Sequence, residues 1–87
     1  MHESSLVRGL VRKVEEVARE AGAERVTGVS VRLGALSPLS PESLIEHFDH
    51  ATIGTSLQGA SMHVVSSNDE TDPNALEVIL ESVEVEV

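Results

Sequence analysis

The residue with the most specific chemistry is His2, because it lies next to the amino group of Met1. In Met1-His2-Glu3, one metal ion can be bound by the terminal amine, the amide nitrogens of residues 2 and 3 and the imidazole. Nitrogen donors of this kind favour the square-planar geometry of Ni(II) or Cu(II). Any chain that begins with Met-His has this potential, and chain termini are often poorly ordered. The residues alone therefore leave open whether Met1, His2 and Glu3 form a metal site.

Three further histidines carry weaker signals. His47 and His50 are three positions apart on a predicted helix, which is close enough for two side chains to share a metal. The helical pattern, however, places His50 away from the apolar face and His47 at its border. A solvated helix surface is the simpler interpretation of this pair, and an accessory metal site is the alternative. His63 alternates with apolar residues along a predicted strand and therefore falls on its polar face, so we expect it to be exposed.

Several classes of function are disfavoured by what the sequence lacks. It contains no cysteine, which excludes disulfides and thiolate metal sites. It has no glycine-rich phosphate loop after a strand, no nucleophile elbow and no spacing that links serine and histidine in a triad, so we expect no enzyme. No apolar run approaches the roughly 20 residues of a membrane helix. We expect a cytoplasmic protein with no membrane partner.

The charge is distributed unevenly along the chain. The net charge is −9, yet all six basic residues lie in the first 32 positions, and the rest of the chain carries ten acids and no Lys or Arg. Such a surface repels phosphate backbones, so we expect no nucleic acid partner. Arg8, Arg12 and Arg19 fall on the outer side of the first predicted helix. This basic stripe serves solubility or docks an acidic partner.

Apolar periodicity predicts two helices. The first spans residues 4–21, with a serine cap at Ser4 or Ser5 and with Gly22 at its end. The second begins at Ser40-Pro41, because a hydroxyl caps a helix and proline fits its first turn. It closes at Gly54. The residues expected on its inner face are Leu44, Ile45, Phe48 and Thr52.

Alternating apolar residues predict three strands, over 25–33, 60–64 and 76–87. The phase of the last strand changes, and a bulge near Glu81-Ser82 would return its apolar residues to one face. The polar stretch 66–74 is a loop. The order αβαββ predicts an α+β fold, with two helices packed on one face of a three-stranded mixed sheet.

Ordered fragments along nearly the whole chain follow one known pattern. They are Met1–Leu6, Val14–Ala23, Arg25–Ser37, Pro41–Leu44, Phe48, Ala51–Thr55, Gly59-Ala60 and Leu80–Val85. In this order and spacing they resemble the HypA/HybF family of hydrogenase nickel-insertion accessory proteins.

The resemblance implies a nickel metallochaperone for nickel–iron hydrogenase maturation. The partners it implies are a HypB-like GTPase and the hydrogenase large subunit, and in some organisms the metal also reaches urease. It further implies that Ni(II) is bound by the Met1 amine, the backbone amides of His2 and Glu3, and the His2 imidazole. Residues 1–87 would then be a single nickel-binding domain. The alternative is a HypA-like partner-binding module that has lost metal delivery.

The chain also departs from the family pattern. Family members carry a zinc domain with two CxxC pairs between the last two strands, and here the loop 66–74 occupies that place. No zinc is therefore expected. We expect the two strands beside this loop to pair as a hairpin. A second departure is Ala35, where a glutamate is common in the family. Whether the zinc domain was lost naturally or by engineering stays open.

Overall fold

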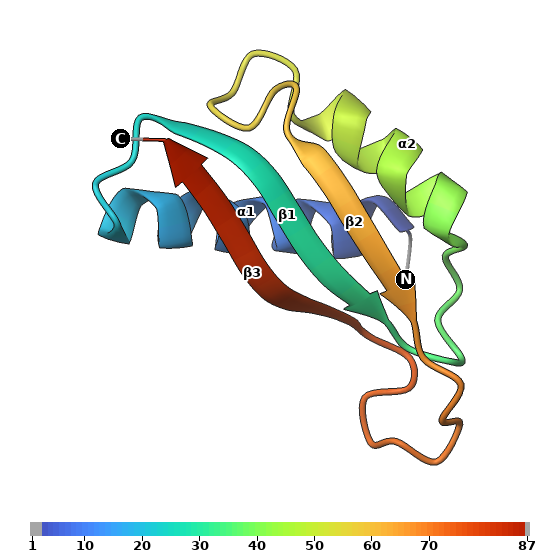
Figure 1. The fold of residues 1–87 in the computed structure, drawn as a ribbon. Helices are drawn as coiled ribbons and strands as arrows, with labels where there is room; N and C mark the ends of the chain where they lie inside the picture. Colours follow the sequence, from blue (N-terminus) through green and yellow to red (C-terminus); the bar gives the residue numbers. More distant parts are fainter. Residues whose placement is uncertain (1–2, 87) are drawn as a thin grey trace.

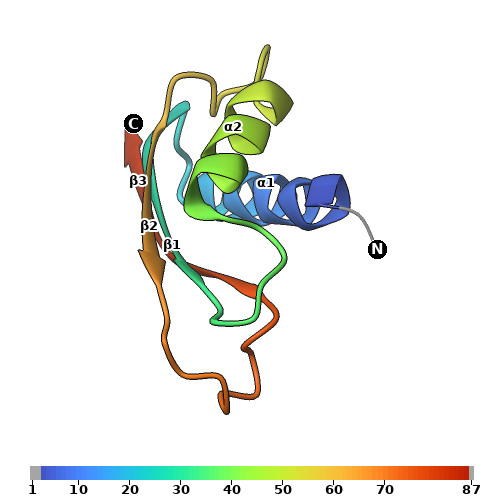
Figure 2. The ribbon, with the colours of Figure 1, turned by 90° about the vertical axis from the view of Figure 1, so that its right-hand side faces the viewer.

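Two helices cover one face of a three-stranded sheet in the computed structural model, which describes residues 3–86 (Figures 1 and 2). The elements are α1 (Glu3–Glu20), β1 (Arg25–Leu33), α2 (Pro41–Ala51), β2 (Ser61–Ser66) and β3 (Val78–Glu86). This arrangement confirms the predicted α+β class and the order αβαββ. Neither helix combines the length and the apolar character that a membrane span requires.

Helix α1 follows the predicted apolar stripe. Its buried side chains are Val7, Leu10, Val11, Val14 and Ala18. Gly22 ends the helix with a φ of 68°, a conformation that glycine adopts without strain. Two details of the prediction are wrong. Ser4 and Ser5 lie inside the helix and do not cap it, and Val17 is 38% exposed because it lies at the margin of the stripe.

Helix α2 begins as predicted but ends earlier. The Ser40 hydroxyl accepts a hydrogen bond from the Ser43 amide at 3.2 Å, and Pro41 is the first helical residue. The helix stops at Ala51, before Gly54. Thr52 follows as the C-cap, and its hydroxyl donates to the Phe48 carbonyl at 2.9 Å. Thr52 is buried on the inner side, as predicted.

The central strand of the sheet is β1, which pairs in parallel with β2 and antiparallel with β3 (Figure 1). The predicted hairpin of the last two strands is therefore wrong, because β2 and β3 lie at opposite edges. The chain between them passes the end of β1 instead. There the Gly34 amide donates to the Glu77 carbonyl at 2.9 Å and the Leu36 amide donates to the Ala75 carbonyl at 2.8 Å.

The predicted bulge in the last strand is confirmed. Ser30 pairs with Ser82 and Val31 pairs with Leu80, which leaves Glu81 as the extra residue on β3. The bulge directs the apolar residues on both of its sides toward the core. The prediction for Leu76 is wrong, since it lies before β3 and is 63% exposed.

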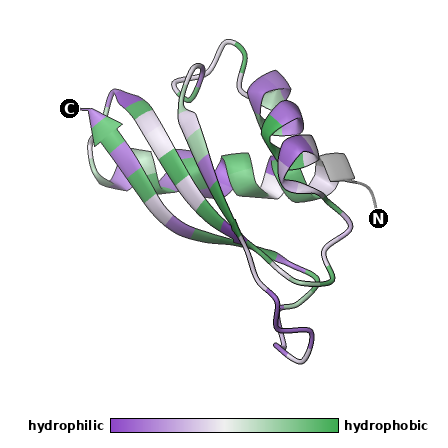
Figure 3. Ribbon diagram, turned by 45° about the vertical axis from the view of Figure 1, so that its right-hand side comes forward, coloured by the Kyte–Doolittle hydropathy of each residue, from purple (hydrophilic) through white to green (hydrophobic). Residues whose placement is uncertain are grey.

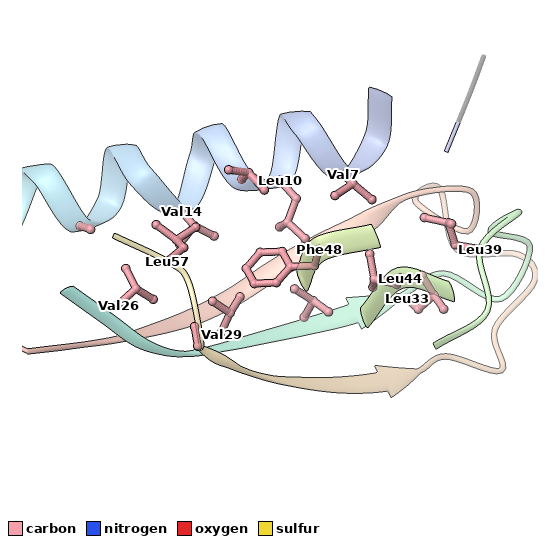
Figure 4. Packing of buried hydrophobic residues seen from close by; sticks show 14 residues of the cluster. Val7, Leu10, Val14, Val26, Val29, Leu33, Leu39, Leu44, Phe48 and Leu57 are labelled. Carbon is pink, nitrogen blue, oxygen red and sulfur yellow. The ribbon is translucent and has the colours of Figure 1, made fainter. Parts of the chain in front are cut away.

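The core lies between the helices and the sheet, and small aliphatic side chains fill most of it. Phe48, the one aromatic residue of the sequence, is fully buried between α1 and β1, near Leu10 and Val29 (Figure 4). Hydrophobic and hydrophilic residues alternate along the strands, so the sheet turns its apolar side to the helices and its polar side outward (Figure 3).

Gly34 and Gly9 offer a matched pair of tests. A Cβ atom on Gly34 would overlap the Ala75 carbonyl group, whereas a Cβ atom on Gly9 would meet no atom within 4 Å. We expect Gly34→Ala to lower the free energy of unfolding by about 1–3 kcal/mol, as overpacking does. Gly9→Ala should raise it by about 0.5–1 kcal/mol, because alanine loses less backbone entropy in a helix. Urea denaturation measures both, and an unchanged stability of Gly34→Ala would contradict the close contact.

Candidate functional site

Of the three residues predicted to bind nickel, only Glu3 belongs to the described part of the chain. Met1 and His2 are outside the described residues, and Glu3 is the first residue of the helix. The first four N–H groups of a helix have no acceptor within it. The amide nitrogen of Glu3 can therefore bind a metal without breaking an intrahelical hydrogen bond.

A hollow of about 410 Å³ separates the first turns of α1 from the second half of α2. The residues that line it are Val7 and Arg8 of α1 and His47, His50 and Ala51 of α2. Val7 lies four residues after Glu3, so the two positions stack on one side of the helix. The hollow thus opens about one helical turn from the backbone of Glu3. The starting end of α1 lies beside α2 in both views of the ribbon (Figures 1 and 2).

The ring of His47 is held in a defined orientation. Its Nδ1 atom lies 2.7 Å from the Ser43 carbonyl oxygen, and the Ser43 hydroxyl is 3.4 Å from the same nitrogen. A carbonyl oxygen only accepts hydrogen bonds, so Nδ1 must carry the proton. In the neutral ring, Nε2 then presents its lone pair, which is the arrangement of a metal-binding imidazole.

His50 lies one turn farther along α2 and is exposed, while His47 is half-buried. The exposure of both side chains agrees with the positions predicted from the helical pattern. A second hollow, of about 240 Å³, is lined by Glu46, His47 and His50. Within residues 3–86, no three or more His, Cys, Asp or Glu side chains stand together as a metal site. This part of the chain offers a pair of imidazoles rather than a complete ligand set.

The basic stripe of α1 borders another hollow, of about 460 Å³. Leu6, Leu10 and Val78 supply apolar surface there, and Arg12 and Lys13 supply positive charge. Arg8, Arg12 and Arg19 are all exposed, as predicted. The side of α1 next to β3 therefore combines apolar residues with two cationic side chains and one acid, Glu16.

The remaining polar predictions concern the sheet and the loop. His63 is exposed on β2, as expected, and the glutamates of β3 are exposed as well. Arg32 and Glu81 form an ion pair at 3.5 Å, but both side chains are more than 40% exposed, so the pair contributes little stability. In the loop, hydrogen bonds from the side chain and the backbone amide of Thr71 lower the pKa of Asp69.

The sequence reasoning missed the hollow between α1 and α2. The helical pattern placed His47 at the border of the apolar face. This was the one indication in the sequence that His47 lies close to a neighbouring element. The pattern of one helix carries no information about which part of another helix packs beside it. The proximity of the two imidazoles to the first turns of α1 therefore emerges only in the fold.

Known proteins resemble this chain over most of its length. Residues 1–84 match the sequence profile of the HypA family, described as hydrogenase/urease nickel incorporation, metallochaperone. The hydrogenase maturation factor HypA of Roseiflexus sp. (strain RS-1) is 45% identical over 64 residues, which are 74% of this chain and 52% of that protein. HybF of Salmonella typhimurium is 39% identical over 64 residues, 74% of this chain and 57% of that protein. The chain thus spans little more than half the length of these relatives.

Solved structures share the fold. The solution structure of the Ni metallochaperone HypA from Helicobacter pylori superposes with a TM-score of 0.79 at 18% identity, covering 98% of this chain and 97% of that one. A second solution structure of a HypA protein gives a TM-score of 0.72 at 22% identity, with 98% and 96% covered. The match over residues 1–84 and the curated relatives show that the chain belongs to the HypA family of hydrogenase and urease nickel-incorporation metallochaperones.

Proposed function

We propose that this chain is a nickel metallochaperone that carries Ni(II) at Met1, His2 and Glu3 for the maturation of nickel–iron hydrogenase. The observation that carries the proposal is the extent of the family match, which begins at residue 1 and so includes these three residues. The donors are the amine of Met1, the amide nitrogens of His2 and Glu3 and the imidazole of His2. Four nitrogens in this arrangement suit square-planar Ni(II).

Electrostatics at the start of α1 make amide donors important. The N-terminal end of a helix carries a partial positive charge, which disfavours a bound cation. Two deprotonated amides cancel the charge of Ni(II), so the complete chelate is neutral. A neutral complex avoids most of the repulsion from the helix end.

The delivery partners we propose are a HypB-like GTPase and the hydrogenase large subunit. The exposed hollow on α1, with its apolar residues beside Arg12 and Lys13, supports docking of an acidic partner segment. We also propose that residues 1–87 act as one nickel-binding domain, with the polar loop 66–74 in place of a zinc domain. This chain has no cysteine with which to build a zinc site of the CxxC type.

The second candidate function is a partner-binding module that no longer delivers metal. The same hollow on α1 favours it, because docking there needs none of the nickel ligands. Nickel binding that depends on His2 and on a free amino terminus separates the two functions.

Nickel titration of protein with a free amino terminus tests the proposed chelate. We expect one tightly bound Ni(II) per chain and a visible absorption band of square-planar Ni(II). His2→Ala and a peptide extension before Met1 should each abolish both signals, because each removes a nitrogen donor. His63→Ala, on the exposed side of β2, is the control and should bind as the parent does. Equal and weak binding by the parent, the two altered proteins and the control would contradict the proposed chelate and favour the partner-binding module.

Proton release provides an independent test of the amide donors. Binding must displace protons from the amine, from the imidazole where it is charged, and from the amides. Affinity should therefore fall as the pH drops through the ordinary pKa values of an amine, about 7.7–8.0, and of an imidazole, about 6.5. Calorimetry in two buffers with different ionisation enthalpies counts the protons. Release of fewer than two protons per Ni(II) would show that at least one amide keeps its proton.

A further inference from the structure

We propose that His47 and His50 form a second, weaker divalent-metal site, at which two imidazoles of α2 bind nickel beside the first turns of α1. The choice of nickel rests on the proposed function, whereas the site itself rests on the geometry of α2. Other borderline divalent cations with an affinity for imidazole would bind in the same way.

The two rings can reach one ion. Positions three apart on a helix are neighbours, with Cβ atoms about 5–6 Å apart. In this structure His47 and His50 line the same two hollows, of about 410 and 240 Å³. An ion between the rings would therefore have room for the water molecules that complete its coordination.

His47 is already oriented as a ligand. Metal-binding histidines commonly donate their second ring N–H to a carbonyl or carboxylate, which fixes the tautomer and the ring orientation. The hydrogen bond from Nδ1 of His47 to the Ser43 carbonyl, at 2.7 Å, does this before any metal binds. The ring therefore loses little freedom on binding through Nε2. His50 is exposed, and its side chain must be restricted to one rotamer when the ion binds.

Charge decides which hollow the ion prefers. Arg8 lines the larger hollow and repels a cation there, whereas Glu46 lines the smaller hollow and attracts one. Glu46 lies four residues before His50, so its carboxylate and that imidazole are neighbours on the helix. Within residues 3–86, no group of three or more His, Cys, Asp or Glu side chains is arranged to hold a metal ion. We therefore assign two imidazole ligands, a carboxylate that contributes charge, and a modest affinity.

The two proposed sites differ in a property that NMR detects. Square-planar Ni(II) is diamagnetic, whereas Ni(II) held by two imidazoles and water is octahedral and paramagnetic. In the parent protein, the first equivalent of nickel should leave the signals of His47 and His50 sharp. Further nickel should broaden them at concentrations at which His63 stays sharp. Broadening of all three histidines at the same concentration would overturn the second site.

A variant series in the His2→Ala background separates failure of this site from failure of the N-terminal chelate. Calorimetry should find weak nickel binding that His50→Gln reduces at least tenfold and that Glu46→Gln weakens less. Arg8→Gln should tighten it. His63→Gln is the matched control and should change nothing, and circular dichroism checks the fold of each variant. Residual binding that His50→Gln leaves unchanged would overturn the second site, whatever His2→Ala does to the tight one.

The tautomer of His47 gives a metal-free test of its orientation. At mildly alkaline pH, nitrogen-15 NMR should find the proton on Nδ1 and a bare Nε2. Ser43→Ala should leave this tautomer in place, because the bond is to the backbone carbonyl and the hydroxyl contact at 3.4 Å is secondary. A proton on Nε2 would remove the basis for His47 as a ready ligand.

Discussion

The arrangement of the molecule depends on the hydrogen bonding of β1 to strands on both of its sides. Its side chains Val26, Val29, Val31 and Leu33 are each at most 3% exposed, so the helices must cover the face from which they project. Two helices on one small face necessarily lie next to each other. This packing brings the first turns of α1, at Val7 and Arg8, beside the second half of α2, where His47 and His50 lie.

Because β1 lies between β2 and β3, the pairing of the strands does not depend on the length or sequence of the segment that joins β2 to β3. These strands never pair, so no hairpin turn has to fix their register. Their connection is held at the end of β1 by buried Ala75 and by backbone bonds from Gly34 and Leu36. The stretch before Ala75 makes local hydrogen bonds of its own, such as the one from the Asn74 amide to the Asp72 carboxylate. Because loop-closure entropy changes slowly with loop length, segments of different size fit at this point.

Local patterns in the sequence predicted what depends on local structure. The bounds of β1, the Ser40 cap and the bulge at Glu81 follow from periodicity and from the chemistry of single residues. The predicted pairing of the last two strands was wrong, because the alternation of β2 and β3 is the same whichever neighbour they have. The hollow beside His47 depends on helix packing, which no single helix encodes. The nickel ligands came from the family resemblance, and Met1 and His2 lie outside residues 3–86, so that part stays a prediction.

A metallochaperone must release its cargo, and the surroundings of the proposed chelate favour release. The positive end of α1, where Glu3 begins the helix, opposes a dication. In the chelate proposed above, retention would depend on amide nitrogens that have lost their protons and cancel the metal charge. Once a partner ligand replaces one of these nitrogens, the amide regains its proton and the charge of the ion is no longer balanced. The same positive surroundings that the neutral chelate tolerates then repel the ion. In the proposed chelate, stability and release would thus follow from one property, the protonation of the amides.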